Sequence, residues 1–455
     1  MNKIVKIMIN FVLIFFLFFV LEVKAVEPNE VLELAEKSGN WIASTAVKQK
    51  VGIGWPDDAL NPDKVGYDLA SGVSGKVVYF VGLYRATGKK KYLNYAVQGS
   101  DYLISLIDKP STFESNTRKA SLYSGISGIG IAIMHVEEEI PEQKYLDALS
   151  KIISLLEKWS TVELNARYWS DQFNDLIYGD TGTILFLSHY SKKFNNPLAK
   201  QMSHQGALFL LSIAKKSNKG IYWLFRRDKD FNLPNFSHGT AGVVYVLSTV
   251  GAQFNDDSVL NGAKLGFQYL RSIAEINNNR IRMPYGWGSD SWIGLYEFGW
   301  AHGLTGVSLT LEQLEQDNVE NDYAQMYSKL IRNTLVDINL QGKPHEPFAE
   351  PSISVDKRFG RAGVLSLLSY WSTKHPDDLE VIALRNLLWQ QMKASVIQDT
   401  QYSHWQVDAP SFMGGSKAAF TGLFHGTAGI GIALLDMHAS MSKTTPYTDL
   451  PDVPF

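Results

Sequence analysis

The 455-residue sequence contains no cysteine. Disulfide bonds, thiolate nucleophiles and thiolate metal ligands are therefore excluded, and a chain without thiols suits an oxidising compartment without depending on one. Charge of one sign is also lacking, because 43 Lys and Arg residues face 46 Asp and Glu residues. The basic residues are scattered along the chain, so the sequence indicates no nucleic-acid-binding surface.

Long hydrophobic runs are lacking except at the N-terminus. Residues 8–21 (MINFVLIFFLFFVL) are almost entirely apolar, Lys3 and Lys6 precede them, and Val23-Lys24-Ala25 follow. This order is typical of a secretory signal peptide, and the run is shorter than the roughly 18 to 20 apolar residues that span a bilayer. We therefore predict a signal peptide at residues 1–25, a secreted or periplasmic protein, and no membrane association after cleavage. The alternative is an uncleaved membrane anchor.

Glycine is abundant, with 36 residues, and many of the glycines recur in one motif. The motif is Gly-x-x-Gly with Ser, Thr or Ala directly before the second glycine, and successive copies lie 53 to 66 residues apart. Seven copies in register indicate a repeat protein. They begin at Gly72, Gly125, Gly179, Gly239, Gly303, Gly360 and Gly426.

The segments around each glycine pair predict two kinds of helix. An apolar run such as residues 243–250 follows each pair, and it is apolar on all sides, which is typical of a buried helix. A longer amphipathic stretch such as residues 145–159 precedes each pair. The apolar runs could instead be strands of an α/β protein, but in phosphate-binding α/β folds a strand precedes the glycines, whereas here a helix and a loop do. We predict helices.

The predicted fold is all-α, an (α/α)7 toroid of seven helix hairpins with Gly-x-x-Gly at the start of each inner helix. Stacked hairpins could also form an open solenoid, but a solenoid needs polar capping units, and the terminal units here resemble the central ones. The glycines should allow close helix approach and turn angles that other residues resist by about 1 kcal/mol. We expect one domain at residues 26–441, a loosely ordered tail at residues 442–455, and a monomer.

A ring of this kind directs seven helix N-termini toward one central cup, where unpaired N–H groups favour anions. Long loops enter the cup, and long ordered loops in compact domains are usually functional. Seven of the eleven tryptophans are expected in these loops, as an aromatic-lined mouth for a peptide or a sugar. They are Trp55, Trp169, Trp223, Trp287, Trp292, Trp300 and Trp405.

Two positions of the repeat carry candidate site residues. The residue before the first glycine is, in order, Ser71, Ser124, Tyr178, His238, His302, Phe359 and His425. A histidine at a helix N-terminus is kept neutral and is available as a base or ligand. Four residues before the first glycine stand Asp68, Asp175 and Asp356, which are candidates for acid–base chemistry or for simple helix caps.

At these motifs the sequence resembles the lanthionine synthetase C-like (LanC-like) family over essentially the whole chain after residue 25. The resemblance rests on residues 235–242 (NFSHGTAG), 175–179 (DLIYG) and 421–430 (TGLFHGTAGI). It implies an (α/α)7 toroid and zinc-assisted addition of a cysteine thiol to a dehydrated Ser or Thr in a peptide. By the same resemblance, His238 and Asp175 are the expected proton-transfer residues.

The sequence departs from the family at the positions of the zinc ligands. The family's Trp-Cys-Tyr-Gly corresponds to residues 300–303 (WAHG), and its Cys-His-Gly corresponds to residues 358–360 (RFG), so Ala301, Arg358 and Phe359 replace the ligands. Glu297 stands where an arginine is expected. Without the metal nothing lowers the pKa of an incoming thiol, so we expect no cofactor and no zinc-dependent thioether formation.

The expected function is peptide binding or modification at the central cup, without zinc-dependent chemistry. One alternative is a glycosidase-like enzyme, with its carboxylate pair drawn from Asp68, Asp175, Asp180, Glu297 and Asp356. Another is a non-catalytic toroid that binds a peptide or a glycan. A third is a rebuilt zinc site at His238, His302 and His425. Beyond the two proton-transfer residues, the candidate ligand-binding residues are His302, His425, Asp68, Glu297, Trp300 and Asp356.

Overall fold

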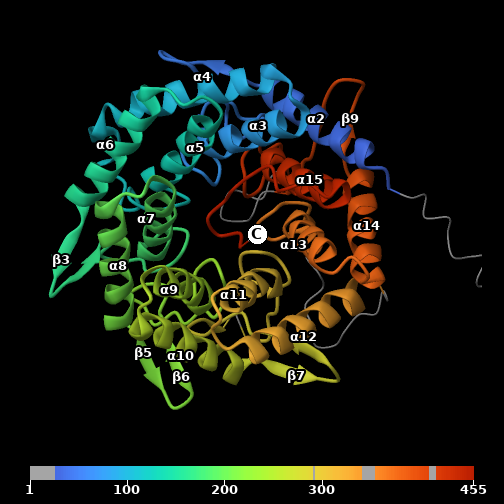
Figure 1. The fold of residues 1–455 in the computed structure, drawn as a ribbon. Coiled ribbons are helices and arrows are strands. Elements are labelled where there is room, and N and C mark those ends of the chain that lie inside the picture. Colours follow the sequence, from blue (N-terminus) through green and yellow to red (C-terminus); the bar gives the residue numbers. More distant parts are fainter. Residues whose placement is uncertain (1–25, 291–292, 341–353, 409–416, 455) are drawn as a thin grey trace, which may run out of the picture.

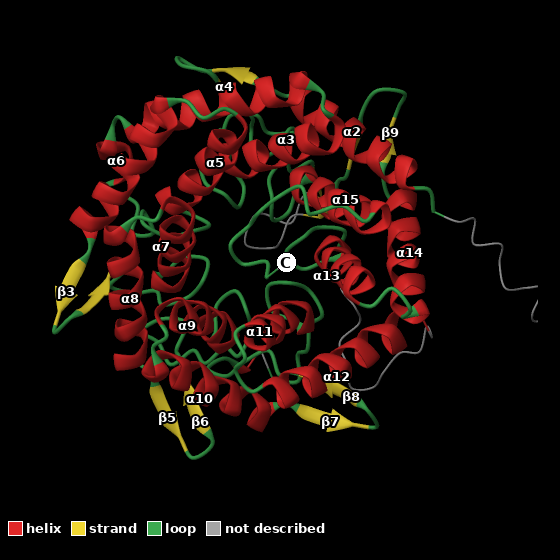
Figure 2. Cartoon of the chain, viewed as in Figure 1, coloured by secondary structure: helices red, strands yellow, loops and turns green. Residues whose placement is uncertain are grey.

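The computed structural model describes residues 26–290, 293–340, 354–408 and 417–454. Within them, 14 α-helices form two concentric rings, which confirms the predicted toroid (Figures 1 and 2). The inner helices are α3 (Val73–Thr87), α5 (Ile126–Glu139), α7 (Asp180–Phe194), α9 (Thr240–Phe254), α11 (Leu304–Gln316), α13 (Arg361–Lys374) and α15 (Thr427–Ser442). The outer helices are α2 (Pro28–Ser44), α4 (Lys90–Ile107), α6 (Gln143–Trp159), α8 (Pro197–Ser212), α10 (Asp257–Ile273), α12 (Asn321–Leu340) and α14 (Leu379–Ala394).

The tight connections follow the inner helices rather than precede them. A short turn, such as the one at Gly88 between α3 and α4, leads from each of the first six inner helices to the next outer helix. The seventh inner helix, α15, packs instead against α2 from the beginning of the described chain (Figure 1). The ring is thus closed by helices from opposite ends of the sequence. The long loops run from outer helix to inner helix and carry the glycine motifs.

The first glycine of each motif is the N-cap of its inner helix, but its role differs from the one predicted. At Gly239, φ is −139° and ψ is −162°, an extended conformation that any residue can adopt, and the other six N-caps have similar angles. Turn-angle freedom is therefore the wrong explanation. A Cβ on Gly239 would lie 1.8 Å from the Leu233 carbonyl oxygen, so the backbone packing leaves no room for a side chain.

The second glycine of each motif receives a side chain from the preceding repeat. A Cβ on Gly128, for example, would lie 2.7 Å from the Leu69 Cβ and 2.3 Å from the Leu122 carbonyl oxygen. The same contact recurs around the whole ring and closes it. The pairs are Leu69–Gly128, Leu122–Gly182, Leu176–Gly242, Phe236–Gly306, Trp300–Gly363, Lys357–Gly429 and Leu423–Gly75.

Backbone hydrogen bonds join the loops at the centre of the ring. They connect residues that stand two or three positions before the first glycine of neighbouring repeats, and one of them, from Phe424 N to Ala70 O (2.9 Å), joins the last repeat to the first. The others are Ala70 N to Tyr123 O, Leu176 N to Ser237 O, Ser237 N to Ala301 O, Ala301 N to Arg358 O, and Arg358 N to Phe424 O. These loops form the floor of the central cup.

Short β-hairpins lie at the periphery of the ring, within the outer-to-inner loops (Figure 2). In the described residues they are β1 (Val47–Lys48) with β2 (Ile53–Gly54), β3 (Thr161–Glu163) with β4 (Ala166–Tyr168), β5 (Lys215–Ser217) with β6 (Gly220–Tyr222), β7 (Glu275–Asn277) with β8 (Arg280–Arg282), and β9 (Ile397–Gln398) with β10 (Ser403–His404). A further strand pair, β11 (Val407–Asp408) with β12 (Lys417–Ala418), lies nearer the cup, where Ala418 lines a cavity together with Ser71 and His425.

The tryptophans that follow these hairpins are buried, or half-buried in the case of Trp169, and they pack against the outer helices, so the predicted aromatic mouth is wrong for them. Trp223 and Trp405 are 1% and 2% exposed, and their Nε1 atoms donate to carbonyls of the preceding outer helix at 2.7 and 2.9 Å. Trp169 makes the same bond, and Trp55 is fully buried. They wedge the hairpins against the outer helices. Of the other loop tryptophans, Trp287 is 42% exposed and Trp292 lies outside the described residues.

The C-terminal tail is ordered, which corrects the expectation of a loose end. After α15 the chain crosses the centre of the ring (Figure 1) and bonds to the middle of α9 and to the C-terminal halves of α3 and α5. Tyr245 Oη donates to the Pro451 carbonyl (3.1 Å), Asp449 N donates to His135 Nε2 (3.1 Å), and Arg85 Nη1 donates to the Tyr447 carbonyl (3.3 Å). Since the cup lies at the N-terminal ends of these helices, the tail closes the opposite end of the ring.

The predicted signal peptide at residues 1–25 lies outside the described residues, so export stays a prediction. Among the described helices, none combines the length and the apolar character that crossing a bilayer requires.

We expect the substitution Gly242→Ala to destabilise the fold by at least about 3 kcal/mol, since the added Cβ would lie 2.1 Å from the Phe236 carbonyl oxygen. Gly88→Ala is the matched control: its Cβ would meet no atom within 4 Å, and its positive φ of 68° costs only about 1 kcal/mol. Urea unfolding measures both. Equal losses in the two variants would contradict the close-approach explanation.

Candidate functional site

The aspartates that stand four residues before the first glycine all cap their own loops. Asp175 Oδ1 accepts from Tyr178 N at 3.1 Å, Asp68 Oδ1 accepts from Ser71 N at 2.7 Å, and Asp356 Oδ1 accepts from Phe359 N at 2.7 Å. This bond fixes one carboxylate oxygen, and in Asp175 and Asp356 the other, Oδ2, lies toward a histidine of the next repeat. Helix capping is the predicted alternative to acid–base chemistry for these aspartates. The structure shows the capping bond, and it shows that Asp175 and Asp356 also contact a histidine through the second oxygen.

Asp175 and His238 form a hydrogen-bonded pair across two repeats. Asp175 Oδ2 lies 2.5 Å from His238 Nδ1, and both side chains are buried. Tyr178 and Phe225 pack against the imidazole at ring-centroid distances of 5.3 and 4.7 Å. The bond to Asp175 keeps the proton on Nδ1, so that Nε2 carries the lone pair. The structure therefore brings together the two predicted proton-transfer residues.

The free nitrogen of His238 meets a guanidinium. Arg358 Nη2 lies 3.1 Å from His238 Nε2, and the Arg358 side chain is buried against the rings of Phe359 and Phe424. Arg358 Nε has no hydrogen-bond partner among the described residues. A buried cation with a spare donor is suited to hold an oxyanion or a carbonyl oxygen beside the imidazole.

Burial and positive charge control the protonation of this pair. Burial first, and then the Arg358 guanidinium, the neighbouring His302 and Arg118, hold the pKa of His238 well below its usual value of 6.5. Burial raises the pKa of Asp175 well above 3.8, while Arg118 and the backbone N–H of Tyr178 act in the opposite direction. His238 is therefore neutral at pH 7 and can accept a proton.

The residues before the first glycines of repeats three to seven form a continuous arc of rings along the cup. Their centroids are 5.3 Å apart from Tyr178 to His238, 5.5 Å from His238 to His302, 5.2 Å from His302 to Phe359, and 5.5 Å from Phe359 to His425. Repeats one and two have serine at this position. One side of the cup is thus aromatic and the other carries hydroxyl groups.

His302 and Glu297 lie together in the fifth repeat. Glu297 Oε2 is 3.5 Å from His302 Nδ1, and Tyr285 packs on the imidazole at 4.8 Å. Burial, with the nearby Glu297 carboxylate, raises the pKa of Tyr285 to about 12. Burial also lowers the pKa of His302. This group borders the His238 pair, because the imidazoles of His238 and His302 are neighbours in the arc.

The remaining predicted residues lie in different surroundings. His425 pairs with Asp356 (Nδ1 to Oδ2, 3.4 Å). Trp300 is only 4% exposed and packs among the rings of Tyr123, Phe236 and Phe424, so it belongs to the core beneath the cup and not to the ligand surface. Asp180 is engaged by Arg227 (2.6 Å) and by two backbone N–H groups, and burial raises its pKa to about 6.

The positions that correspond to the family's zinc ligands do not fit a metal. They hold the methyl group of Ala301, the guanidinium of Arg358 and the phenyl ring of Phe359, none of which donates an electron pair to zinc. In the described part of the chain, no three His, Asp or Glu residues gather as a metal site. The alternative site at the three rim histidines is not assembled, because the Phe359 ring lies between His302 and His425 in the arc.

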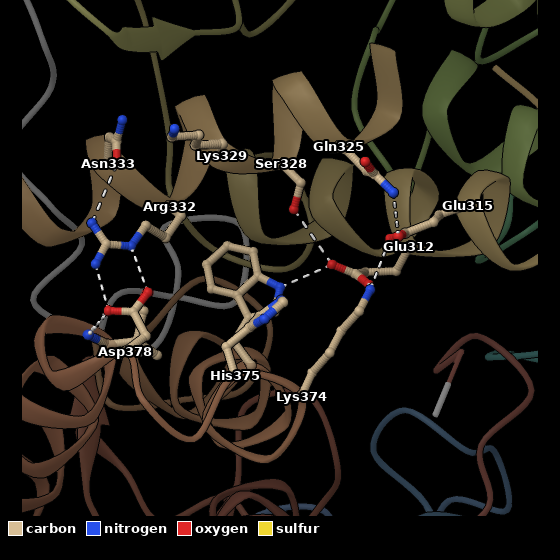
Figure 3. A pocket seen from close by; sticks show the side chains of 12 residues that line it. Glu312, Glu315, Gln325, Ser328, Lys329, Arg332, Asn333, Lys374, His375 and Asp378 are labelled. Carbon is tan, nitrogen blue, oxygen red and sulfur yellow. Dashed lines mark hydrogen bonds and ion pairs between the residues drawn. The ribbon is translucent and has the colours of Figure 1, made fainter. Parts of the chain in front are cut away.

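A cavity of about 560 Å³ lies outside the cup, between α11, α12, α13 and α14 (Figure 3). Most of its charged groups are paired with one another. Glu312, 3% exposed, accepts from Trp371 Nε1 (2.9 Å) and Lys374 Nζ (2.7 Å), and Arg332 binds Asp378 (2.5 Å). This network holds the fifth and sixth repeats together, so we interpret the cavity as a structural seam.

Sequence reasoning noted Arg358 only as a lost zinc ligand and missed its contact with His238. It also missed Arg118, which lies 3.8 Å from the centroid of the Tyr178 ring. The sequence does carry a signal for Arg358, since this residue stands two positions before a first glycine, where the loops meet at the centre. Nothing in the motif itself singles out Arg118.

Comparison with known proteins agrees with this architecture. A model of the family described as lanthionine synthetase C-like protein matches residues 63–347, which is more than half of the chain. The solved structure of nisin cyclase is similar at 16% identity, with a TM-score of 0.58 over 85% of this chain and 91% of that chain. An unsaturated glucuronyl hydrolase specific for heparin has 10% identity and a TM-score of 0.49 over 93% of this chain and 100% of that one.

An alpha-1,6-mannanase of Salegentibacter sp. HEL1_6 has 10% identity and a TM-score of 0.44, over 81% of this chain and 99% of that chain. By sequence, the curated proteins include no match. At 16% identity, the nisin cyclase structure shows the fold and not the reaction. The family match covers the first five repeats, from the first motif to the end of the fifth hairpin, and includes Asp175 and His238. The chain belongs to the lanthionine synthetase C-like family.

Proposed function

We propose that the protein is a peptide-modifying enzyme that transfers a proton to or from the carbon next to a peptide carbonyl, without a metal ion. The observation that carries the proposal is the buried line Asp175–His238–Arg358, with contacts of 2.5 and 3.1 Å. A neutral imidazole oriented by a carboxylate is a general base, and a buried guanidinium beside it stabilises developing negative charge. The chain belongs to the lanthionine synthetase C-like family and is similar in structure to nisin cyclase, which favours a peptide as substrate.

The chemistry follows from where the protons lie. When a substrate carbonyl oxygen takes the N–H that Arg358 now directs at His238, the Nε2 lone pair becomes free. His238 then accepts the proton from the carbon next to the carbonyl, the electron pair moves onto the oxygen as an enolate, and Asp175 stabilises the imidazolium. In the direction of addition, His238 takes the proton of an amine, hydroxyl or thiol as that nucleophile bonds to the β-carbon of a dehydrated residue. The electron pair of the carbon–carbon double bond moves onto the carbonyl oxygen as an enolate, and His238 then returns the proton to the carbon next to the carbonyl.

The carbohydrate alternative is less well supported. A glycosidase needs two carboxyl groups that flank the scissile bond, roughly 5 to 10 Å apart. Asp68, Asp175 and Asp356 each use Oδ1 to cap a loop, and two of them use Oδ2 to hold a histidine. Because these carboxylate oxygens are already hydrogen-bonded, the aspartates are better suited to orient imidazoles than to attack a sugar.

We expect His238→Ala and Asp175→Asn to lower turnover by about 10²- to 10⁴-fold, as loss of a general base does. Dehydroalanine-containing peptides with an internal amine, hydroxyl or thiol are incubated in D2O, and mass spectrometry detects the deuterium that ring closure adds at Cα. His204→Ala is the control, since His204 forms a similar pair with Asp256 (2.7 Å) on the outer helices. If His238→Ala and Asp175→Asn both incorporate deuterium as the wild type does, the proposed proton transfer is wrong, and the non-catalytic binding toroid remains.

The pH dependence should report the neutral state of His238. Because its pKa is held well below 6.5, the base form persists at neutral pH, and kcat/KM should fall only when the pH drops well below 6.5. We expect Arg358→Met to reduce kcat by about 10²- to 10³-fold and to move this acid limb to higher pH, because removing the cation favours the imidazolium. Arg358→Lys keeps the charge and should leave the limb in place. An unchanged limb in Arg358→Met would count against the contact.

Metal removal should not affect the wild-type protein. We expect chelator treatment to leave turnover unchanged and metal analysis to find no stoichiometric zinc, since Ala301, Arg358 and Phe359 supply no ligand. The combined variant Ala301→Cys, Arg358→Cys and Phe359→His restores the ligand types that the family resemblance implies and should bind about one zinc per chain. Chelator-sensitive turnover of the wild type would contradict a metal-free mechanism.

A further inference from the structure

The pair of Asp356 and His425 repeats the geometry of the proton-transfer pair at another point of the ring. In both pairs, the aspartate stands four residues before the first glycine of one repeat, and the histidine stands directly before the first glycine of the next. Burial tends to raise the pKa of Asp356, but the contact with His425 and the N–H of Phe359 bring it below 3.8. Asp356 is therefore ionised and orients His425 through Nδ1.

The other nitrogen of His425 has no use in the cup chemistry described above. The side chain is 6% exposed, and Nε2 is buried without a hydrogen-bond partner among the described residues. His425 lines a cavity of about 370 Å³ at the junction of the seventh and first repeats. A buried polar atom without a partner costs about 1 to 3 kcal/mol, so this atom is suited to a ligand.

A second acceptor lines the same cavity. Asp57 Oδ1 accepts from Gly66 N at 3.1 Å, whereas Asp57 Oδ2 has no well-aligned hydrogen bond. Its neighbour is the Lys64 ammonium at 3.0 Å, on a side chain that is 79% exposed. Lys76 Nζ, which is fully buried, lies 3.9 Å from Oδ1 and donates to the Ser71 carbonyl at 2.7 Å. The Asp57 carboxylate therefore already holds an ammonium group at the solvent side of the cavity.

The charges and the hydrogen-bond acceptors around this cavity determine which kind of ligand it can bind. Asp57, Asp58 and the ionised Asp356 outnumber Lys64 and Lys76, so an anion is disfavoured. The Asp58 oxygens are engaged by Ala419 N (2.9 Å) and Asn61 Nδ2 (2.7 Å) and shape the wall. What remains are His425 Nε2, which has no partner among the described residues, and Asp57 Oδ2, whose neighbour is the exposed Lys64 ammonium that a ligand can replace. A group with several N–H donors and a positive charge suits both acceptors.

We propose that this cavity is a subsite for a primary ammonium group of the peptide, with His425 Nε2 and the Asp57 carboxylate as its acceptors. The ammonium can come from the peptide N-terminus or from a lysine side chain. The subsite deepens the proposed function, because it rests on the cup taking a peptide. It also explains why the seventh repeat carries a second oriented histidine at the end of the ring arc.

The first test uses small amines and needs no turnover. In protein labelled with ¹⁵N-histidine, n-butylamine should shift the Nε2 resonance of His425, and n-butyltrimethylammonium, which has the charge but no N–H, should shift it at least about tenfold less. An equal response to both cations would overturn the subsite, and so would no response of His425 to the primary amine. The assignment of the resonance comes from the variant His425→Gln.

The second test uses equilibrium binding to His238→Ala protein, so that turnover does not interfere. Peptides with a free amine should bind about 10- to 100-fold more weakly after His425→Phe or Asp57→Asn, whereas fully acetylated peptides should bind alike to all variants. Acetylating only the N-terminus or only the lysine identifies the source of the ammonium. His375→Phe, in the outer cavity, is the matched control. Unchanged affinity in both variants overturns the proposal.

The outcomes separate this subsite from the proposed function. If the amine shifts His425 but no peptide is turned over, the subsite stands and the proton-transfer proposal fails. If peptides are labelled in D2O with equal kcat/KM for acetylated and free forms, the proton-transfer proposal stands and the subsite fails. Unfolding curves of His425→Phe check that lost binding does not reflect a lost fold, and the resonance experiment on unsubstituted protein is independent of that variant.

Discussion

The close approach of neighbouring loops at the second glycine of each motif is the constraint on which the rest of the structure depends. At each of these seven positions, a Cβ would lie within 3.5 Å of a side chain from the preceding repeat and still closer to a carbonyl oxygen of its own loop. The contact draws the loops inward until the backbones of neighbouring loops hydrogen-bond near the centre, from Leu176 through Arg358 and Phe424 to Ala70 and Tyr123. The cup floor, the direction of the inner helices and the position of every rim residue follow from it.

The electrostatics of the cup show how such a ring can hold a positive charge without a metal ion. The backbone circuit places Arg358 at the floor, and burial between the rings of Phe359 and Phe424 keeps its guanidinium beside His238. The cation lowers the pKa of the imidazole, and the imidazole keeps a lone pair available. In most sites a guanidinium and a histidine compete for anions, whereas here the aspartate of the previous repeat satisfies the histidine from its other side.

The ring arrangement also explains why one type of pair occurs twice. An aspartate that caps its own loop can place its second oxygen toward the next repeat, so any repeat with Asp followed by a repeat with His gains an oriented imidazole. Asp175 with His238 and Asp356 with His425 meet this condition. Asp68 does not, because the following repeat has Ser124 at the corresponding position. Repetition of the scaffold thus supplies sites that sequence variation can use separately.

The sequence by itself determined the seven hairpins and the helical class, because these depend on local periodicity and on a motif that repeats in register, and its resemblance to the family singled out His238 and Asp175. The tertiary structure alone decided that the loop tryptophans are wedges, that the tail closes the far end of the ring, and that the glycines serve packing and not turn angles. It also decided the contact of Arg358 with His238, 120 residues apart in sequence. Such contacts depend on closure of the ring. Closure results from the small rotations between all seven successive repeats, and a local sequence pattern does not determine their total.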